Sequence, residues 1–173
     1  MTLRWFDRVF DFSFPVEIFP TILERLRGTP ARLEEKLRSI DEAIRTRRVG
    51  ESWSIQEHAG HLLDLDELHI ARLDDYETGA AVLRAADLKN RKTWESNHNA
   101  RRAEEIFGAF RDERARFVAR LESWPEDRLA ASSLHPRLGR PMRVVDMGYF
   151  VAEHDDHHLA RMTELAKLLT AES

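Results

Sequence analysis

The apolar residues of this chain recur at spacings of three and four, which is the period of an amphipathic α-helix. The first stripe of this kind consists of Leu33, Leu37, Ile40 and Ile44. It follows Thr29 and Pro30, a pair typical of a helix start, because threonine caps free backbone amides and proline fits the first turn. We therefore predict a first helix over residues 29–45, with a boundary or kink near Gly28.

A second helix is predicted from Ser54 to about Tyr76. Its apolar stripe consists of Ile55, Leu62, Leu65, Leu68 and Leu73. Ser54 is followed three residues later by Glu57, which is the pattern of a capping box. Gly79 lies just beyond the last apolar position and is expected to end the helix.

Two further helices are predicted over residues 99–122 and 144–169. Their stripes consist of Ile106, Phe110, Phe117 and Leu121, and of Met147, Val151, Met162, Leu165 and Leu169. Pro125 stops the earlier of the two, since a helix rarely continues up to a proline. Residues 132–141 include two prolines and a glycine, so we expect a loop or a small hairpin there.

Taken together, these elements predict an all-α protein, a four-helix bundle. Residues 79–97 form a long connection between the second and third helices, with one short helical turn. We expect a single domain over 1–173, with the bundle in 29–169. Residues 1–28 form an N-terminal arm and the first turns. Six of the first twenty residues are aromatic, so we expect this arm to pack onto the domain or onto a second subunit.

Composition narrows the possible partners of the 173-residue chain. With 27 Lys and Arg against 31 Asp and Glu, the formal net charge is -4, and no long basic run favours nucleic acid. The apolar runs are far shorter than the ~20 residues of a membrane-spanning helix. There is no cysteine, which excludes thiolate metal sites and a cysteine nucleophile. Lacking disulfides and a secretory signal, the protein is expected to be soluble and cytoplasmic.

Histidine is the residue type that points to chemistry. Six of the eight histidines fall in two groups along the chain: His58, His61 and His69, then His154, His157 and His158. His154 and His158 are four residues apart, so both face one side of a helix, as two ligands of a divalent metal do. The alternative is an ordinary pair of hydrogen-bonded histidines.

Periodicity does not choose a third ligand. The apolar face of the second predicted helix lies nearer to His58 and His69 than to His61, which lies at the edge of the stripe. The position of the third ligand therefore stays open at this level.

Three segments together resemble the DinB/YfiT-like superfamily. Residues 53–62, WSIQEHAGHL, are similar to its first signature, in which a metal-binding histidine follows a tryptophan by eight residues. Residues 153–159, EHDDHHL, are similar to its HxxHH signature, whose first and last histidines bind metal. Residues 135–139, HPRLG, resemble a His-Pro-x-x-Gly segment of the YfiT-like branch. The resemblance extends from about Thr29 to Leu169, and the aromatic arm lies outside it.

Carried over to this chain, the resemblance implies a metal site made of His61, His154 and His158. It also implies a four-helix bundle that binds one divalent ion, nickel or zinc, and often forms a homodimer. Some members are transferases that use a low-molecular-weight thiol such as bacillithiol, mycothiol or glutathione, and others are described as metal-dependent hydrolases. The expectation is thus an enzyme acting on a small-molecule substrate. The alternative is a non-catalytic metal-binding structural or stress-response protein.

Such a site suits catalysis, because three neutral imidazoles leave the ion its charge and an open position. Water or a thiol held there is acidified. Around the predicted ligands, Glu57 lies one turn before His61 and could accept its other N–H. Asp155 or His157 could orient the ligands of the last helix or move a proton.

Three more residues are weaker candidates for substrate binding. Arg137 and Arg140 lie near the start of the last helix and could hold an anionic group there, and a solvated basic loop is the alternative. Trp94, in the long connection, could form a wall of a pocket, or else anchor that connection to the bundle.

Overall fold

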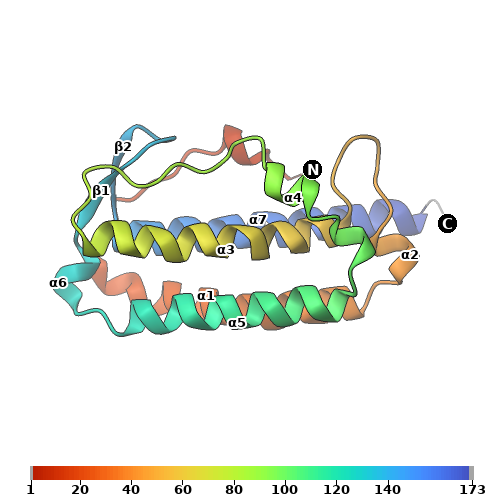
Figure 1. Ribbon diagram of the computed structural model, residues 1–173, viewed down its shortest axis with the longest axis horizontal. Coiled ribbons are helices and arrows are strands. Elements are labelled where there is room, and N and C mark those ends of the chain that lie inside the picture. Colours follow the sequence, from red (N-terminus) through yellow and green to blue (C-terminus); the bar gives the residue numbers. More distant parts are fainter. Residues whose placement is uncertain (1, 172–173) are drawn as a thin grey trace.

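Four long helices form the frame of the molecule, and Figure 1 shows how they are arranged. They are α1 (Phe19–Arg38), α3 (Ile55–Glu77), α5 (Ala103–Glu122) and α7 (Val144–Ala171). The computed structural model describes residues 2–171. α1 contacts α5, α5 contacts α3, α3 contacts α7 and α7 contacts α1, so the helices close a ring. The predicted four-helix bundle is confirmed.

The order of the helices requires a long crossover. α3 and α5 run in the same direction, so the chain must return along the bundle between them (Figure 1). Residues 78–102 make this return and include α4 (Arg91–Glu95) and the 3₁₀ turn η3 (His98–Ala100). The predicted long connection between the second and third long helices is therefore present.

The first helix begins earlier than predicted. α1 starts at Phe19 and continues through Thr29 and Pro30, so the expectation of a helix start at Thr29 is wrong. Proline has no N–H to offer the carbonyl one turn earlier, that of Leu26. A side chain from another helix takes this place: Arg114 Nη1 lies 3.4 Å from the Leu26 carbonyl oxygen. A tertiary contact thus accommodates the proline inside the helix.

The first helix also ends earlier than predicted, at Arg38, and a separate short helix, α2 (Glu42–Arg45), follows it. The start of α3 agrees with the prediction. The Ser54 Oγ accepts the Glu57 N–H at 3.1 Å, and the Glu57 carboxylate accepts the Ser54 N–H at 2.8 Å. Gly79, with a φ of 67°, follows the end of α3 in the left-handed conformation that favours glycine.

A small hairpin precedes the last helix. After α6 (Glu126–Leu129), strands β1 (Ser132–His135) and β2 (Arg140–Arg143) pair antiparallel, with Ser132 opposite Arg143. The N-terminal arm includes the 3₁₀ turns η1 (Trp5–Asp7) and η2 (Val16–Ile18). Figure 1 shows the arm, the 78–102 connection and the hairpin on one side of the α3–α7 pair, with α1 and α5 on the other. In this structure the arm packs onto its own domain.

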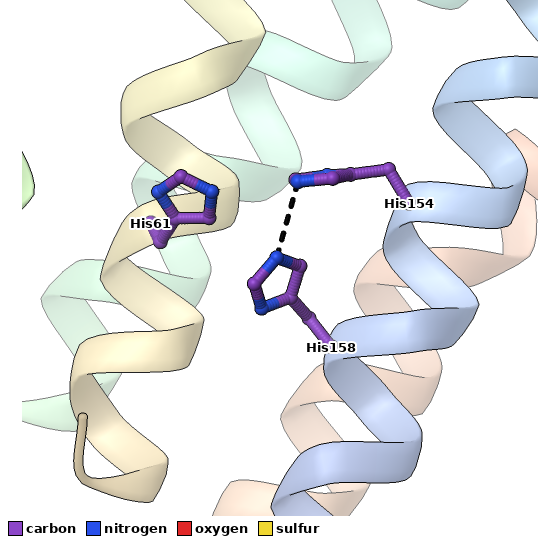
Figure 2. A group of neighbouring side chains, drawn as sticks. All are labelled: His61, His154 and His158. Carbon is purple, nitrogen blue, oxygen red and sulfur yellow. Dashed lines mark hydrogen bonds between the residues drawn. The ribbon is translucent and has the colours of Figure 1, made fainter. Parts of the chain in front are cut away.

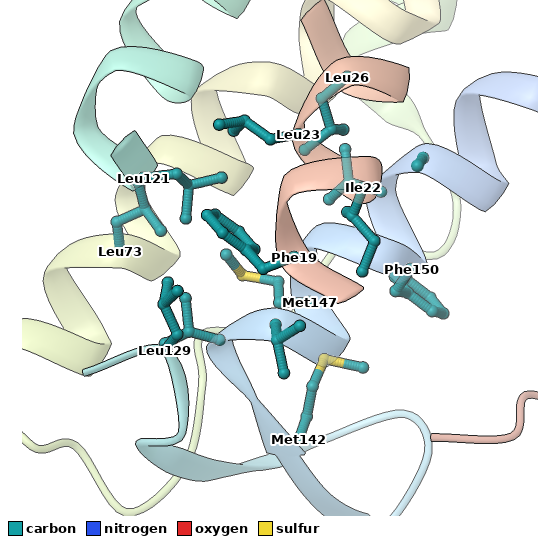
Figure 3. Close-up of a cluster of buried hydrophobic side chains, with 14 of the residues drawn as sticks. Phe19, Ile22, Leu23, Leu26, Leu73, Leu121, Leu129, Met142, Met147 and Phe150 are labelled. Carbon is teal, nitrogen blue, oxygen red and sulfur yellow. The ribbon is translucent and has the colours of Figure 1, made fainter. Parts of the chain in front are cut away.

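The interior has two apolar clusters. In one, shown in Figure 3, Phe19, Ile22 and Leu26 of α1 lie among side chains of the other helices and of the hairpin. The other cluster contains Leu33, Ile55, Ile106, Phe110 and Met162. The stretch of the bundle between the two clusters holds buried polar side chains instead, and the candidate site lies there.

Among residues 2–171, no helix combines the length and the apolar character that crossing a bilayer needs.

Candidate metal centre

Three histidines from two antiparallel helices meet in the middle of the bundle. His61 extends from α3, and His154 and His158 extend from consecutive turns of α7 (Figure 2). Each offers one ring nitrogen, and the three nitrogens lie within 4.8 Å of one another. All three side chains are buried. The structure therefore brings together the three residues that the resemblance singles out.

The spacing of the two nitrogens on α7 suits a shared ion. The Nε2 atoms of His154 and His158 lie 3.1 Å apart (Figure 2). Two imidazole nitrogens about 2.05 Å from one ion are about 3.3 Å apart at a tetrahedral angle and about 2.9 Å apart at a right angle. The observed distance lies between these two values.

A chain of hydrogen bonds holds the ring of His61. The Thr93 hydroxyl donates its single hydrogen to Asp64 Oδ2 at 2.9 Å, so its oxygen is left to accept the Nδ1–H of His61 at 3.1 Å. The proton of His61 is thereby placed on Nδ1, and Nε2 keeps a lone pair for an ion. His98 adds a second contact to Asp64 Oδ2, at 2.9 Å from its Nε2.

The contact between His98 and α3 depends on a glycine. A Cβ atom added to Gly60 would lie 2.2 Å from ring atoms of His98, closer than atoms can approach. Gly60 therefore lets the 78–102 connection lie against α3 beside His61. The hydrogen-bonding residues Thr93, Asp64 and His98 were not singled out by the sequence motifs.

His158 is held by a fourth histidine. Nδ1 of His58 lies 2.8 Å from Nδ1 of His158, so one of the two rings donates to the other. When the His158 ring donates, its Nε2 is free to bind an ion. His154 differs, because its Nδ1 is buried and has no partner among the described residues.

Burial keeps these rings neutral. It lowers the pKa of His61 to about 3, and repulsion from neighbouring histidines, when charged, adds to the effect. The same causes hold the pKa of His154 and of His158 well below the ordinary value. Neutral imidazole is the form that binds metal, so the site needs no deprotonation at neutral pH.

Glu57 has a different role from the one expected beside His61. Its carboxylate accepts the Ser54 N–H and the Nε–H of Arg48, both at 2.8 Å. Arg48, through this pair, helps to hold the pKa of Glu57 below its ordinary value, against the effect of burial. Thr93, rather than Glu57, faces the second nitrogen of His61. Glu57 thus caps α3 and joins it to the preceding loop.

Asp155 also lies away from the three nitrogens. It is fully buried and binds Thr29 of α1 and Arg114 of α5. Arg114 in turn binds Asp66 of α3 through Nε and Nη2 at 3.0 and 2.9 Å. This ionic cluster joins all four long helices at the level of the histidines, so Asp155 fixes the helices that carry them.

A cavity of about 390 Å³ lies over the histidines. The arm, the connection and the hairpin all contribute to its walls. Its larger apolar and aromatic lining residues include Trp5, Phe6, Trp53, Leu65, Leu68 and Phe150. The ring centroid of Trp5 lies 5.0 Å from that of His154, which places the N-terminal arm directly at the site. No sequence motif marked the arm as part of it.

Of the remaining candidate site residues, two line the cavity and two lie outside its walls. His157 and Arg137 line the cavity. Arg140 does not, because its Nη1 donates to the carbonyl oxygen of Phe10 at 3.0 Å. Trp94 is also absent from the walls; it is 44% exposed and packs against Trp53, with ring centroids 5.7 Å apart. Trp94 is thus the anchor of the connection rather than a wall of the pocket.

A family model described as the DinB superfamily matches residues 25–162. The chain belongs to this superfamily. Among solved structures, the DinB-superfamily chain resembles YfiT from Bacillus subtilis, a probable metal-dependent hydrolase with an unusual four-helix bundle topology. The TM-score is 0.79 and the identity is 18%, over 94% of each chain.

A second similar structure is the mycothiol-dependent maleylpyruvate isomerase. Its TM-score is 0.67 and its identity 14%, over 86% of this chain and 61% of the isomerase chain. At such identities the likeness shows a shared fold. No curated protein matches this DinB-superfamily chain in sequence at a significant level.

Proposed function

We propose that this DinB-superfamily protein binds one divalent ion, nickel or zinc, through His61, His154 and His158, and uses it to transform a small molecule. One observation carries the proposal. Three buried, neutral imidazoles converge beneath a cavity that reaches them, and within residues 2–171 no fourth protein ligand joins their group. Three-ligand sites of this kind are typical of catalytic rather than structural metal centres.

The surrounding residues support such a site in two ways. Thr93 and His58 orient two of the ligand rings, which keeps their metal-binding nitrogens aimed at one point. Trp5, Trp53 and Phe150 supply apolar walls against which the apolar part of a small molecule would pack. The oriented rings limit the rearrangement that binding at the site would need.

The ion would supply acidity, since a divalent metal lowers the pKa of water or of a thiol bound to it. The chain has no cysteine of its own. A sulfur nucleophile would therefore have to come from a low-molecular-weight thiol that enters the cavity. The two structural neighbours support the two forms of the proposal, since one is described as mycothiol-dependent and the other as a probable hydrolase.

Cobalt substitution distinguishes these forms. Bacillithiol, mycothiol and glutathione are titrated into the cobalt-loaded protein, and thiol use predicts a sulfur-to-cobalt charge-transfer band that is lost in His158→Ala. Hydrolysis instead predicts no such band and metal-dependent cleavage of simple esters or amides. A fully loaded protein that shows neither thiol binding nor turnover would contradict catalysis and favour a non-catalytic metal protein.

A further inference from the structure

One part of the cavity wall has a different chemistry from the metal centre. It is lined by Arg72 of α3 and by His135 and Arg137 at the turn of the hairpin. Arg72 lies eleven residues after His61 on the same helix, which is about 16 Å along the axis. Helical side chains lean toward the N-terminus of their helix, so Arg72 leans toward the histidines.

Arg72 is a buried cation without a counter-ion. Its side chain is 3% exposed, and its Nε donates to the Arg84 carbonyl oxygen at 3.1 Å. Within residues 2–171, no carboxylate lies within ion-pair distance of its guanidinium, because the nearby Asp75 pairs with Arg84 instead. Burial lowers the pKa of Arg72 to about 10, and it stays charged at neutral pH. Arg114, equally buried, binds two carboxylates.

Arg137 adds a second positive charge that has no ion-pair partner among residues 2–171. Its guanidinium lies over the rings of Trp5, Phe6 and Phe150, at 5.7, 5.3 and 5.4 Å from their centroids. Its Nη2 is buried and has no hydrogen-bond partner among the described residues. Aromatic faces stabilise a cation but leave its N–H groups unsatisfied in the plane.

His135 supplies a third donor at the same place. It is 2% exposed, and its Nδ1 accepts the backbone N–H of Leu138 at 3.2 Å. The proton of the neutral ring is therefore on Nε2, which is buried and unpartnered within the described part of the chain. Burial, followed by the charges of Arg72 and Arg137, lowers the pKa of His135 to about 3. The ring thus stays a neutral donor at physiological pH.

Among the described residues, one carboxylate lines the cavity, that of Asp87, and it already has hydrogen-bond partners. It accepts the Nε–H of Arg91 at 2.9 Å and the backbone N–H of Lys89 at 3.1 Å. The histidines that line the cavity do not offset the arginines. Arg72, which is buried, and Arg137, which is half-buried, repel each other, and this is costly unless an anion enters with the ligand.

We propose that Arg72, Arg137 and the Nε2–H of His135 bind a carboxylate group of the substrate, whose apolar body lies against the aromatic walls. The planar guanidinium groups suit a carboxylate, which two parallel N–H groups can bind together. The assignment rests on the proposed function as far as the reacting end of the substrate is concerned. The binding of the carboxylate end is argued separately, from the contacts of Arg72, Arg137 and His135.

Isothermal titration calorimetry with 4-phenylbutyrate and its neutral amide, 4-phenylbutyramide, tests the proposal. Both probes share the apolar body and differ in the charge. The full chain is titrated as purified and again after metal removal, since a carboxylate could also bind an ion directly. We expect the carboxylate to bind at least about tenfold more tightly than the amide in both forms of the protein. Because the metal-free form is included, the preference for the carboxylate can be interpreted even if the protein proves to bind no metal.

Charge-removing variants locate the effect. Arg72→Met and Arg137→Met should each abolish most of the preference for the carboxylate, and Arg72→Lys should keep part of it. Arg140→Met is the matched control, because Arg140 lies three residues after Arg137 but outside the cavity walls, where it donates to the Phe10 carbonyl oxygen. This variant should keep the preference.

Equal binding of the two probes would overturn the proposal, and so would an unchanged preference in a folded Arg72→Met protein. If Arg72→Met does not fold, Arg137→Met decides, since its side chain is only half-buried. Tighter binding of 3-phenylpropylphosphonate than of 4-phenylbutyrate would contradict the assignment of a carboxylate.

Discussion

The hydroxyl of Thr93 is expected to control metal affinity although it does not face the proposed ion. Thr93 is 2% exposed and joins His61 to Asp64 by two buried hydrogen bonds. Thr93→Val keeps the shape of the side chain and removes both bonds. The His61 ring then loses the acceptor that holds its proton on Nδ1, and its Nε2 is no longer kept free.

The magnitude follows from the type of contact. Loss of an outer hydrogen bond to a metal ligand typically lowers affinity by about 10- to 100-fold, or about 1.4 to 2.8 kcal/mol. Asp64 keeps its contact to His98, so the fold should survive. We expect a loss of about 1 to 3 kcal/mol in the free energy of unfolding from the buried groups left unpaired.

The assay is competition for zinc against a chromophoric chelator of known affinity. Thr93→Ser restores the hydroxyl and should bind zinc nearly as well as the unmodified protein. Thr78→Val is the matched control, because the exposed Thr78 hydroxyl bonds only to backbone carbonyls of its own helix. Zinc affinity of Thr93→Val within twofold of the unmodified protein would refute the role given to Thr93. An equal loss in Thr93→Ser would point to packing instead of the hydroxyl.

Three further predictions concern stability. Arg114→Met leaves Asp66 and Asp155 buried without their cation and should lower the free energy of unfolding by about 3 to 5 kcal/mol in urea titrations; a loss under 1 kcal/mol would contradict this. Arg114 holds the pKa of Asp66 below its ordinary value, so the ionised Asp66 carboxylate stabilises the fold above a pH of about 4. The difference in the free energy of unfolding between the unmodified protein and Asp66→Asn should therefore shrink as the pH falls from about 5 to 3, and a constant difference would contradict this. Removing the metal should lower Tm in calorimetry, since an ion at a hundredfold excess over Kd adds about 2.7 kcal/mol; an unchanged melt after verified removal would oppose a stabilising site.

The ends of α3 could be predicted from the sequence because the interactions that fix them are local. The Ser54–Glu57 capping box and Gly79 predicted the limits of α3 because both act within a few residues of the chain. The same kind of signal misplaced the start of α1. Thr29 and Pro30 look like a helix start, but Thr29 bonds to Asp155 and Arg114 takes the carbonyl that Pro30 cannot serve. No local pattern reports contacts to residues so distant in sequence.

The candidate site, too, could be predicted from the sequence only in part. The four-residue spacing identified His154 and His158 on α7. On α3, however, His61 lies at the edge of the apolar stripe, so the periodicity of apolar residues did not indicate that it faces the site. The His61 ring is held by a hydrogen bond to Thr93, which belongs to the connection and not to α3. The resemblance identified His61 because the family motif places a metal-binding histidine at this position, without any reference to the tertiary contacts that hold its ring.

Arg72 and Trp5 could not have been found from patterns. Arg72 lies among the charged residues of a helix whose exposed face is also charged, and its burial depends on the hairpin and the connection lying over it. Trp5 is one of many aromatics in the arm, and its contact with His154 depends on how the arm crosses the bundle. Both positions are set by tertiary structure.

The metal content of the protein tests the central claim most directly. Protein purified without a histidine tag or a nickel column is measured by elemental analysis, together with His61→Ala, His154→Ala, His158→Ala and His157→Ala. His157 lines the cavity but lies outside the group of three, so its variant is the matched control. We predict about one nickel or zinc ion per chain in the unmodified protein and in His157→Ala, and almost none in the other three. Full metal content in folded His154→Ala or His158→Ala, or in His61→Ala together with its loss in His58→Ala, would contradict the assignment.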